Sequence, residues 1–218
     1  MRRWAAGLAI ALVALAACSG DDDSGGGGGS SDTTVVAVDV DDISAVVVAG
    51  SRDADITVGS AASASIHGTG DDASKVTAEV TNGNLFLRTP DGFQRSGPLD
   101  VVLTTPSLTQ ASIAGTGNLT VTGVQADRFI AEIAGTGNLT ASGAASSLTA
   151  SLGGRGDLAL TGLPADDVDV QLIGQGNVGV HANRHLKINI IGDGNVVYQG
   201  DPTVEQVITG NGTVQKAS

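Results

Sequence analysis

The octapeptide IAGTGNLT occupies residues 113–120 and recurs, letter for letter, at residues 133–140. Each copy contains a Gly-x-Gly turn, and turns of this form continue toward the C-terminus, with first glycines 20, 19, 20, 18 and 18 residues apart. A period of about 19 residues without helical periodicity is typical of a β-solenoid, in which each repeat forms one coil. The six turns are Gly115-Thr116-Gly117, Gly135-Thr136-Gly137, Gly154-Arg155-Gly156, Gly174-Gln175-Gly176, Gly192-Asp193-Gly194 and Gly210-Asn211-Gly212.

Apolar and polar residues alternate on both sides of every turn, which predicts two short strands per coil with one buried face each. Val170, for example, is expected to face the core, and Gln171 the solvent. The sequence therefore predicts an all-β, single-domain β-solenoid, similar to a parallel β-helix, with two sheets joined by the Gly-x-Gly turns. The predicted inward rows contain Phe129, Ala131, Ile133, Leu148, Ala150, Leu152, Val168, Val170, Leu172, Leu186, Ile188 and Ile190 before the turns, and Leu119, Val121, Leu139, Ala141, Leu158, Leu160, Val178, Val180, Val196 and Tyr198 after them.

The glycines and the residue that follows each pair are predicted to have structural roles. Glycine adopts positive φ without steric cost, and Asn and Asp tolerate the left-handed region while satisfying local backbone groups. The predicted turn residues are Gly115, Gly117, Asn118, Gly135, Gly137, Asn138, Gly154, Gly156, Asp157, Gly174, Gly176, Asn177, Gly192, Gly194 and Asn195.

The N-terminal segment is predicted to direct export. Arg2 and Arg3 precede an apolar stretch that is too short to span a bilayer, which is typical of a signal peptide, here residues 1–17. The stretch ends in Leu15-Ala16-Ala17-Cys18, which resembles a bacterial lipobox. In proteins with this motif the cysteine is acylated and becomes the mature N-terminus. Cys18 is therefore the predicted lipidation site, and as the sole cysteine it can form no disulfide within the chain.

The rest of the chain divides into a linker and one domain. Residues 18–32 are acidic and then Gly/Ser-rich, without the apolar content that folding requires. Residues 33–218 are long enough for one domain. Within it the repeat is degraded over residues 33–106, which predicts irregular first coils and a cap over the core. Residues 107–218 are expected to form the regular coils.

The charge balance excludes one class of partner. The chain has 11 basic and 23 acidic residues, and nine basic residues remain without Arg2 and Arg3. Such an acidic surface repels nucleic acid and anionic headgroups, so no nucleic-acid binding is expected. Attachment to a membrane is expected through the lipid on Cys18 instead.

The chain resembles a known family over residues 35–214. The resemblance rests on the G-x-G-[ND]-[LV] turns, the segment Val197-Tyr198-Gln199-Gly200-Asp201-Pro202, and the final Gly210-Asn211-Gly212 after an irregular N-terminal β segment. These features are similar to the autotransporter adhesin head, or GIN, domain. The resemblance implies a β-solenoid like those of the pectin lyase superfamily, without their catalytic residues, and a role in adhesion.

The residue types indicate no catalytic, metal or cofactor site. A polysaccharide lyase on this scaffold needs clustered carboxylates that hold Ca²⁺, a nearby base and aromatic platforms for sugar rings. Without the signal peptide the chain has no Trp, one Tyr and three Phe. The G-G-x-G-x-D spacing of calcium-binding solenoids is also not matched by Gly153-Gly154-Arg155-Gly156-Asp157.

Two short matches are interpreted as coincidences of the repeat. Arg128, Ser147, Asp167 and His185 occupy equivalent corner positions in successive coils, but a catalytic triad needs its histidine between the serine and the acid. Arg155-Gly156-Asp157 spells a cell-attachment tripeptide, yet its glycine and aspartate are turn positions of the repeat. A recognition role for the tripeptide is the alternative.

We therefore expect a non-enzymatic, lipid-anchored extracytoplasmic protein that acts as an adhesion or interaction module. Its expected partners are the membrane, through the lipid, and a glycan or protein surface. The alternative is a polysaccharide-binding or polysaccharide-processing β-helix, which a groove with convergent carboxylates near the loop of residues 89–98 would favour. The sequence leaves the oligomeric state and the ligand open.

Overall fold

A computed structural model of the chain describes residues 14–15, 33–38, 43–90 and 92–217. The described residues form strands almost throughout, with one short 3-10 helix, η1, and none of their helices is long and apolar enough to cross a membrane. The prediction of an all-β fold is confirmed. The elements are β1 (Ala14–Leu15), β2 (Thr33–Val38), β3 (Ala45–Val48), β4 (Asp53–Val58), β5 (Ser63–Thr69), η1 (Ala73–Lys75), β6 (Thr77–Thr81), β7 (Asn84–Arg88), β8 (Leu99–Thr105), β9 (Gln110–Ile113), β10 (Thr116–Ile133), β11 (Thr136–Gly192), β12 (Asn195–Gln199), β13 (Thr203–Gly210) and β14 (Thr213–Lys216).

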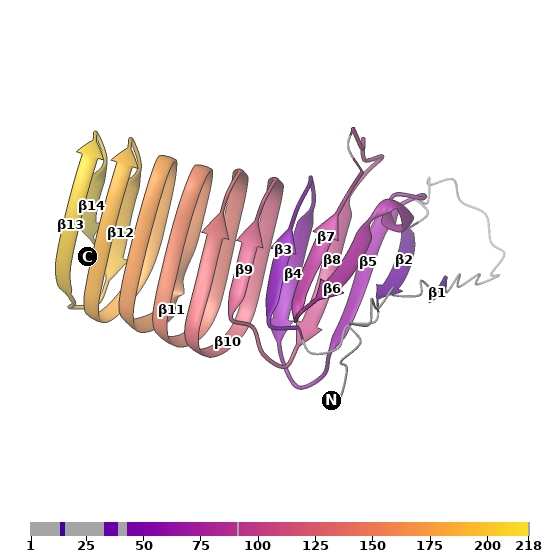
Figure 1. The fold of residues 1–218 in the computed structure, drawn as a ribbon, viewed down its shortest axis with the longest axis horizontal. Coiled ribbons are helices and arrows are strands. Elements are labelled where there is room, and N and C mark those ends of the chain that lie inside the picture. The colour runs from indigo at the N-terminus through magenta and orange to yellow at the C-terminus, as the bar shows by residue number, and fades with distance from the viewer. Residues whose placement is uncertain (1–13, 16–32, 39–42, 91, 218) are drawn as a thin grey trace, which may run out of the picture.

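From β9 onward, successive turns of the chain stack in parallel register. β10 pairs with β11 so that Leu119 lies opposite Leu139, one repeat later in the sequence. The end of β11 pairs in the same way with β12 and β13, where Ile190 lies opposite Ile208. The coils stand side by side along the long axis of the molecule (Figure 1). Equivalent residues of the repeat therefore form rows that run across the coils.

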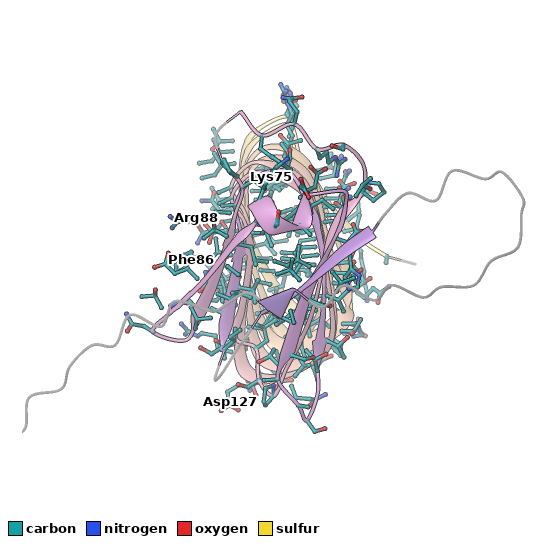
Figure 2. All side chains as sticks on the ribbon, turned by 90° about the vertical axis from the view of Figure 1, so that its right-hand side faces the viewer. Lys75, Phe86, Arg88 and Asp127 are labelled. Atoms are coloured by element: carbon teal, nitrogen blue, oxygen red, sulfur yellow. The ribbon has the colours of Figure 1, made fainter. Side chains whose placement is uncertain are left out.

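The inward rows form one continuous core. Phe129, Val170 and Ile190 are fully buried, whereas Gln171 is exposed, so the predicted register is confirmed. Of the predicted inward residues, Tyr198 is the exception, because it is half-buried at the edge of the core. A view along the long axis shows two layers of strands with side chains filling the space between them (Figure 2).

A third part of each coil also contributes to the core, which the sequence interpretation missed. Val124, Leu163, Ala165 and Ala182 are fully buried, and they lie in the bends between the two strands of a coil, away from the glycine turns. The spacing of apolar residues changes there, and the ladder between β10 and β11 shifts register after Val121. The irregular spacing obscured these positions in the sequence pattern.

The N-terminal strands are not stacked in chain order, and the prediction of irregular first coils in residues 33–106 did not specify their pairing. β4 pairs with both β8 and β10, and β3 pairs with both β7 and β9, all in parallel. The β3–β4 segment thus lies between two neighbours that follow it in the sequence. Beyond them, β2 with β5, β5 with β8, and β6 with β7 are antiparallel pairs.

The two ends of the molecule differ. At the N-terminal end, η1 lies across the space between the layers, with Ala73 fully buried (Figure 2). Asp72 is also buried, and its carboxylate accepts hydrogen bonds from the backbone and hydroxyl of Ser96, which fastens the loop of residues 92–98. At the C-terminal end, β13 pairs only with β11 and β14 only with β12 among the described strands.

Candidate functional site

The residues that follow the glycine pairs form a hydrogen-bonded ladder along one edge of the coils. Asn138 Nδ2 donates to Asn118 Oδ1 at 2.9 Å, and Asn177 Nδ2 donates to Asp157 Oδ1 at 2.8 Å. The ladder continues from Asn195 Nδ2 to Asn177 Oδ1 at 3.2 Å. Each of these three asparagine amides thus donates to the equivalent residue of the preceding coil. These contacts tie neighbouring turns together at every level.

The two glycines of each turn stack against the backbone of the preceding coil. A Cβ at Gly137 would overlap the carbonyl oxygen of Gly117, and a Cβ at Gly156 would overlap that of Gly137. Gly156 also has a φ of +135°, which side-chain-bearing residues rarely adopt. Close approach of stacked backbones therefore selects glycine, in addition to backbone conformation.

The conformational part of the turn prediction needs correction. Among the described non-glycine residues Asn82 alone has a positive φ, so the Asn and Asp residues of the ladder do not adopt the left-handed conformation expected for them. Gly115, Gly135 and Gly194 also lack the positive φ that was expected of the turn glycines. The polar residues serve the turns through side-chain hydrogen bonds between coils.

The ladder includes one turn more than the sequence repeat, and this turn stacks on the first Gly-x-Gly turn at residues 115–117. Gly50-Ser51-Arg52-Asp53 stacks on Gly115-Thr116-Gly117-Asn118, and Asp53 Oδ1 accepts hydrogen bonds from the backbone and side chain of Asn118 at 2.7 and 3.0 Å. The sequence interpretation placed a turn at Gly50 but did not include it in the repeat, because Arg52 replaces the second glycine. The Asp at the ladder position, followed by alternating Ala54 and Ile56, was the available signal.

Arg52 is a buried cation in this first turn. Its side chain is 1% exposed, and Nη2 donates to the carbonyl oxygen of Ala49 at 2.7 Å. Nε and Nη1 have no hydrogen-bond partner among the described residues. Burial lowers the pKa of Arg52 to about 10, so the guanidinium remains charged at neutral pH.

The cell-attachment tripeptide is part of the same ladder. Asp157 Oδ1 accepts hydrogen bonds from the backbone and side chain of Asn177, and the Asp157 backbone N–H donates to Asn138 Oδ1 at 3.2 Å. Arg155 is exposed, and its backbone N–H donates to Gly135. The aspartate is therefore engaged in holding the turns together.

The row of corner residues lines a surface groove. Register pairs place Arg128 opposite Ser147 and His185 opposite Thr203. The groove has a volume of about 440 Å³, and its lining combines apolar residues with charged side chains of both signs. It is lined by Arg128, Ser147, Leu148, Thr149, Asp167, Val168, Asp169, His185, Leu186, Lys187, Thr203 and Glu205. The sequence interpretation had singled out only the corner row, because the second row, from Thr149 to Glu205, has no common residue type.

The corner residues are bound to groups other than one another. Ser147 Oγ donates to the carbonyl oxygen of Asp127 at 3.2 Å. Arg184 Nη2 donates to Asp167 Oδ2 at 3.0 Å, while Asp167 Oδ1 has no partner among the described residues. No hydrogen bond joins Ser147, Asp167 and His185 in the described part of the chain. The groove therefore offers separate donors and acceptors to a ligand, rather than an assembled nucleophile.

A second depression lies beside the loop of residues 89–98. Asp53 and Asp100 are register partners on β4 and β8, and together with Arg95 they line a cavity of about 420 Å³. His67 lies opposite Asp100 on β5, and its Nε2 is 2.9 Å from Ser65 Oγ. Hydrogen bonds to Asn118 already occupy Asp53 Oδ1. The described residues contain no group of three His, Cys, Asp or Glu side chains that could hold a metal ion.

Cys18 lies outside the described residues, as do most of the predicted signal peptide and the whole linker.

Comparisons with known proteins identify the fold. Residues 42–202 match the model of a family described as "Putative auto-transporter adhesin, head GIN domain". A search of curated proteins found no match. The structure is similar to a "putative adhesin" from Bacteroides fragilis NCTC 9343, with a TM-score of 0.70 and 18% identity over 86% of this chain and 98% of that chain.

Two structures from Parabacteroides distasonis ATCC 8503 are also similar. A "putative adhesin" has a TM-score of 0.56 and 22% identity over 85% of this chain and 97% of that chain. A "Putative lipid binding protein" has a TM-score of 0.52 and 18% identity over the same shares, 85% and 97%. Identities this low establish a shared fold. The family match spans most of the described chain, and the protein belongs to the family of the auto-transporter adhesin head, the GIN domain.

Proposed function

We propose that the parallel coiled sheet is a β-solenoid with about 19 residues per coil that acts as a non-catalytic interaction module on the cell envelope. The solenoid assignment is supported by ladder hydrogen bonds that join residues 18–20 positions apart. The glycine columns support it as well, because they let the backbones of successive turns approach closely.

The groove along the corner row is the proposed binding surface, and it is the observation on which the function rests. It crosses several coils and presents Arg128, Asp167, His185 and Lys187 without an assembled nucleophile. A row of separated donors and acceptors of both signs suits an extended polar ligand, such as a glycan or a polypeptide segment. Membership of an adhesin head family is consistent with this role.

Binding by the groove can be tested with the purified protein on arrays of glycans and immobilised surface proteins. Lys187→Glu reverses a charge within the groove, so we expect it to weaken binding at least about tenfold, which corresponds to about 1.4 kcal/mol. Arg155→Ala is the matched control, because Arg155 is an exposed cation outside the groove. Loss of binding in Arg155→Ala alone would assign recognition to the tripeptide instead.

Lipid anchorage at Cys18 is the second part of the proposal. It rests on the lipobox-like Leu15-Ala16-Ala17-Cys18 and on the acidic surface, which disfavours electrostatic binding to membranes. Cys18→Ser should move the protein from the detergent phase to the aqueous phase on partition. Unchanged partition of this variant would contradict lipidation.

The alternative is a polysaccharide-binding or polysaccharide-processing protein, and the depression beside the loop of residues 89–98 favours it. Asp53, Asp100 and Arg95 line this depression. Because Asp53 already accepts hydrogen bonds from Asn118, polysaccharide binding is better supported than polysaccharide processing. The test is incubation with acidic and neutral polysaccharides, followed by assays for new reducing or unsaturated ends. Products that disappear in Asp100→Asn would establish processing.

A further inference from the structure

The C-terminal coil leaves strand edges open in both layers. β13 pairs only with β11, and β14 pairs only with β12, whereas the equivalent segments of inner coils have neighbours on both sides in the described chain. Ile208 occupies the inward row of the fully buried Ile190, yet it is 38% exposed. Val207, on the outer face, is 64% exposed. The core therefore continues into the last coil, where none of the described residues covers it.

The β13 edge has few of the features that normally prevent strand pairing, whereas β14 ends in Lys216, which is ion-paired with Asp201. Edge strands are usually protected by Pro, Lys, bulges or covering elements. β13 is eight residues long, has Glu205 as its one charged residue, and pairs with β11 without a register shift. At the other end, by contrast, η1 lies across the core (Figure 2).

The arrangement in two layers restricts what can cover this end. A single peptide strand can pair with β13 or with β14, but not with both. A partner that covers both must offer two strand edges with the same separation and with inward faces that match. The C-terminal end of a second copy of this chain meets this requirement, because it has the same two edges at the same spacing.

We propose that two copies of the chain pair end to end through their last coils. A two-fold axis normal to both layers, close to the viewing direction of Figure 1, places β13 against β13 of the second copy. The same rotation places β14 against its counterpart, and both new pairs are antiparallel. The inward rows of the two copies then become continuous.

Side-chain faces and charge define the register of this pairing. In an antiparallel pair, directly opposed residues point to the same face of the sheet. The two-fold axis must therefore place one residue opposite the same residue of the second copy, rather than opposite its neighbour in the sequence. Val207 on β13 and Gln215 on β14 are each four residues from Asn211 in the last turn. A two-fold axis that passes Val207 in one layer therefore passes near Gln215 in the other layer. In this register Lys216 lies opposite Val214 of the second copy. An axis at Gln206 would instead oppose two Lys216 side chains, which is unfavourable.

The first test compares the association of the purified full-length chain with that of two lysine variants, by sedimentation velocity at micromolar concentration. Val207→Lys places two like charges beside the axis and should abolish the dimer. Val102→Lys is the matched control, because Val102 is an exposed valine on the central strand β8, far from the end coil. A monomeric wild type, or a Val207→Lys dimer as stable as that of the control, would overturn the proposal.

The second test reports the register directly and does not depend on the lysine variants. Val207→Cys should form an interchain disulfide under mild oxidation, because directly opposed residues of antiparallel strands have Cα atoms within disulfide range. Val102→Cys and the unsubstituted chain, whose sole cysteine is Cys18, give the background. Crosslinking no higher than this background would refute pairing at Val207.

Discussion

Gly137 and Gly156 lie in neighbouring coils, and each stands where the backbone of the preceding coil leaves no room for a side chain. A glycine in this position is usually explained by its own φ and ψ angles. Here the neighbouring chain adds a second requirement, which applies even to Gly135, whose φ is not positive. At the scale of the residue, the glycines therefore recur because neighbouring coils pack closely at these positions.

The residues of one turn should differ sharply in their tolerance of substitution. Gly156→Ala should lower the free energy of unfolding by about 1–3 kcal/mol, because the new methyl group overlaps the carbonyl oxygen of Gly137. Arg155→Ala should change it by less than about 0.5 kcal/mol, because Arg155 is exposed. Urea denaturation measures both values. Equal effects at the two positions would contradict the stacking argument.

Arg52 should be more costly as a cation than as an apolar side chain. Two of its buried nitrogens lack partners, and a buried charge pays desolvation that an apolar side chain of similar length avoids. Arg52→Met should therefore equal or exceed the wild type in stability, whereas Arg52→Ala should be destabilised by about 2 kcal/mol or more through the cavity. Thermal and urea unfolding distinguish these outcomes.

The lowered pKa of Arg52 adds a dependence on pH with a defined sign. The folded state disfavours the charged form, so the cost of burial is fully present at neutral pH and decreases as pH rises above the folded value of about 10. The stability advantage of Arg52→Met should accordingly shrink in strongly alkaline buffer. An advantage that grows with pH would contradict the burial of a charged guanidinium.

At the scale of the element, the ladder acts as the contact between successive turns. Asn177 donates to Asp157 and accepts from Asn195, so it bonds to both neighbouring coils. A side-chain amide suits this position because it has both a donor and an acceptor. The order of Asn and Asp along the ladder also keeps carboxylates from facing one another directly, since Asn138 and Asn177 stand on either side of Asp157.

Changing Asn177 should test this arrangement. Asn177→Ala removes two side-chain hydrogen bonds and should cost about 1 kcal/mol. Asn177→Asp places a carboxylate against Asp157, which should destabilise the protein further at pH 7 and less in acidic buffer, where protonation relieves the repulsion. Asn189→Asp is the control, because its partner on β13 is the neutral Val207. A pH-independent loss in Asn177→Asp would contradict repulsion within the ladder.

The buried faces of the later strands were predictable at this scale, and the pairing of the N-terminal strands was not. Period-two alternation specifies which face of a strand is buried, so Phe129 and Val170 could be assigned to the core. Which strands become neighbours is specified by long-range pairing, and no local pattern placed β4 beside β10. The sequence placed Arg128 and His185 in one row, but this row was interpreted as a coincidence and no groove was expected there. Lys187 and Glu205 needed the register between coils.

At the scale of the whole molecule, the regular region is a one-dimensional stack in which each coil contacts mainly its two neighbours. Such stacks tolerate the loss of a complete repeat, because the coils on either side can join through equivalent surfaces. This property separates the chain from compact domains, in which removal of an internal segment of similar length usually disrupts the core.

Deletion of residues 135–153 should leave a folded protein. The deletion removes one complete coil and joins Ala134 to Gly154, which preserves every row. We expect cooperative unfolding with an m-value reduced by roughly a tenth, in proportion to the surface lost. Deletion of residues 140–149 is the control, because it shifts the later rows by about half a coil and should prevent folding. Equal stability of the two deletions would show that coil register is unimportant.

The position of β3 and β4 between later strands has a kinetic consequence. These strands are synthesised early, but each lies between neighbours that follow it in the sequence. Asp53, for example, bonds to Asn118, which lies 65 residues later. Folding therefore cannot proceed from the N-terminus as the chain is released. We expect the regular coils to provide the nucleus, with closure of this long loop as the slow step. If the chain is exported as proposed above, this order would delay completion of the N-terminal sheet until the second half of the chain has crossed the membrane.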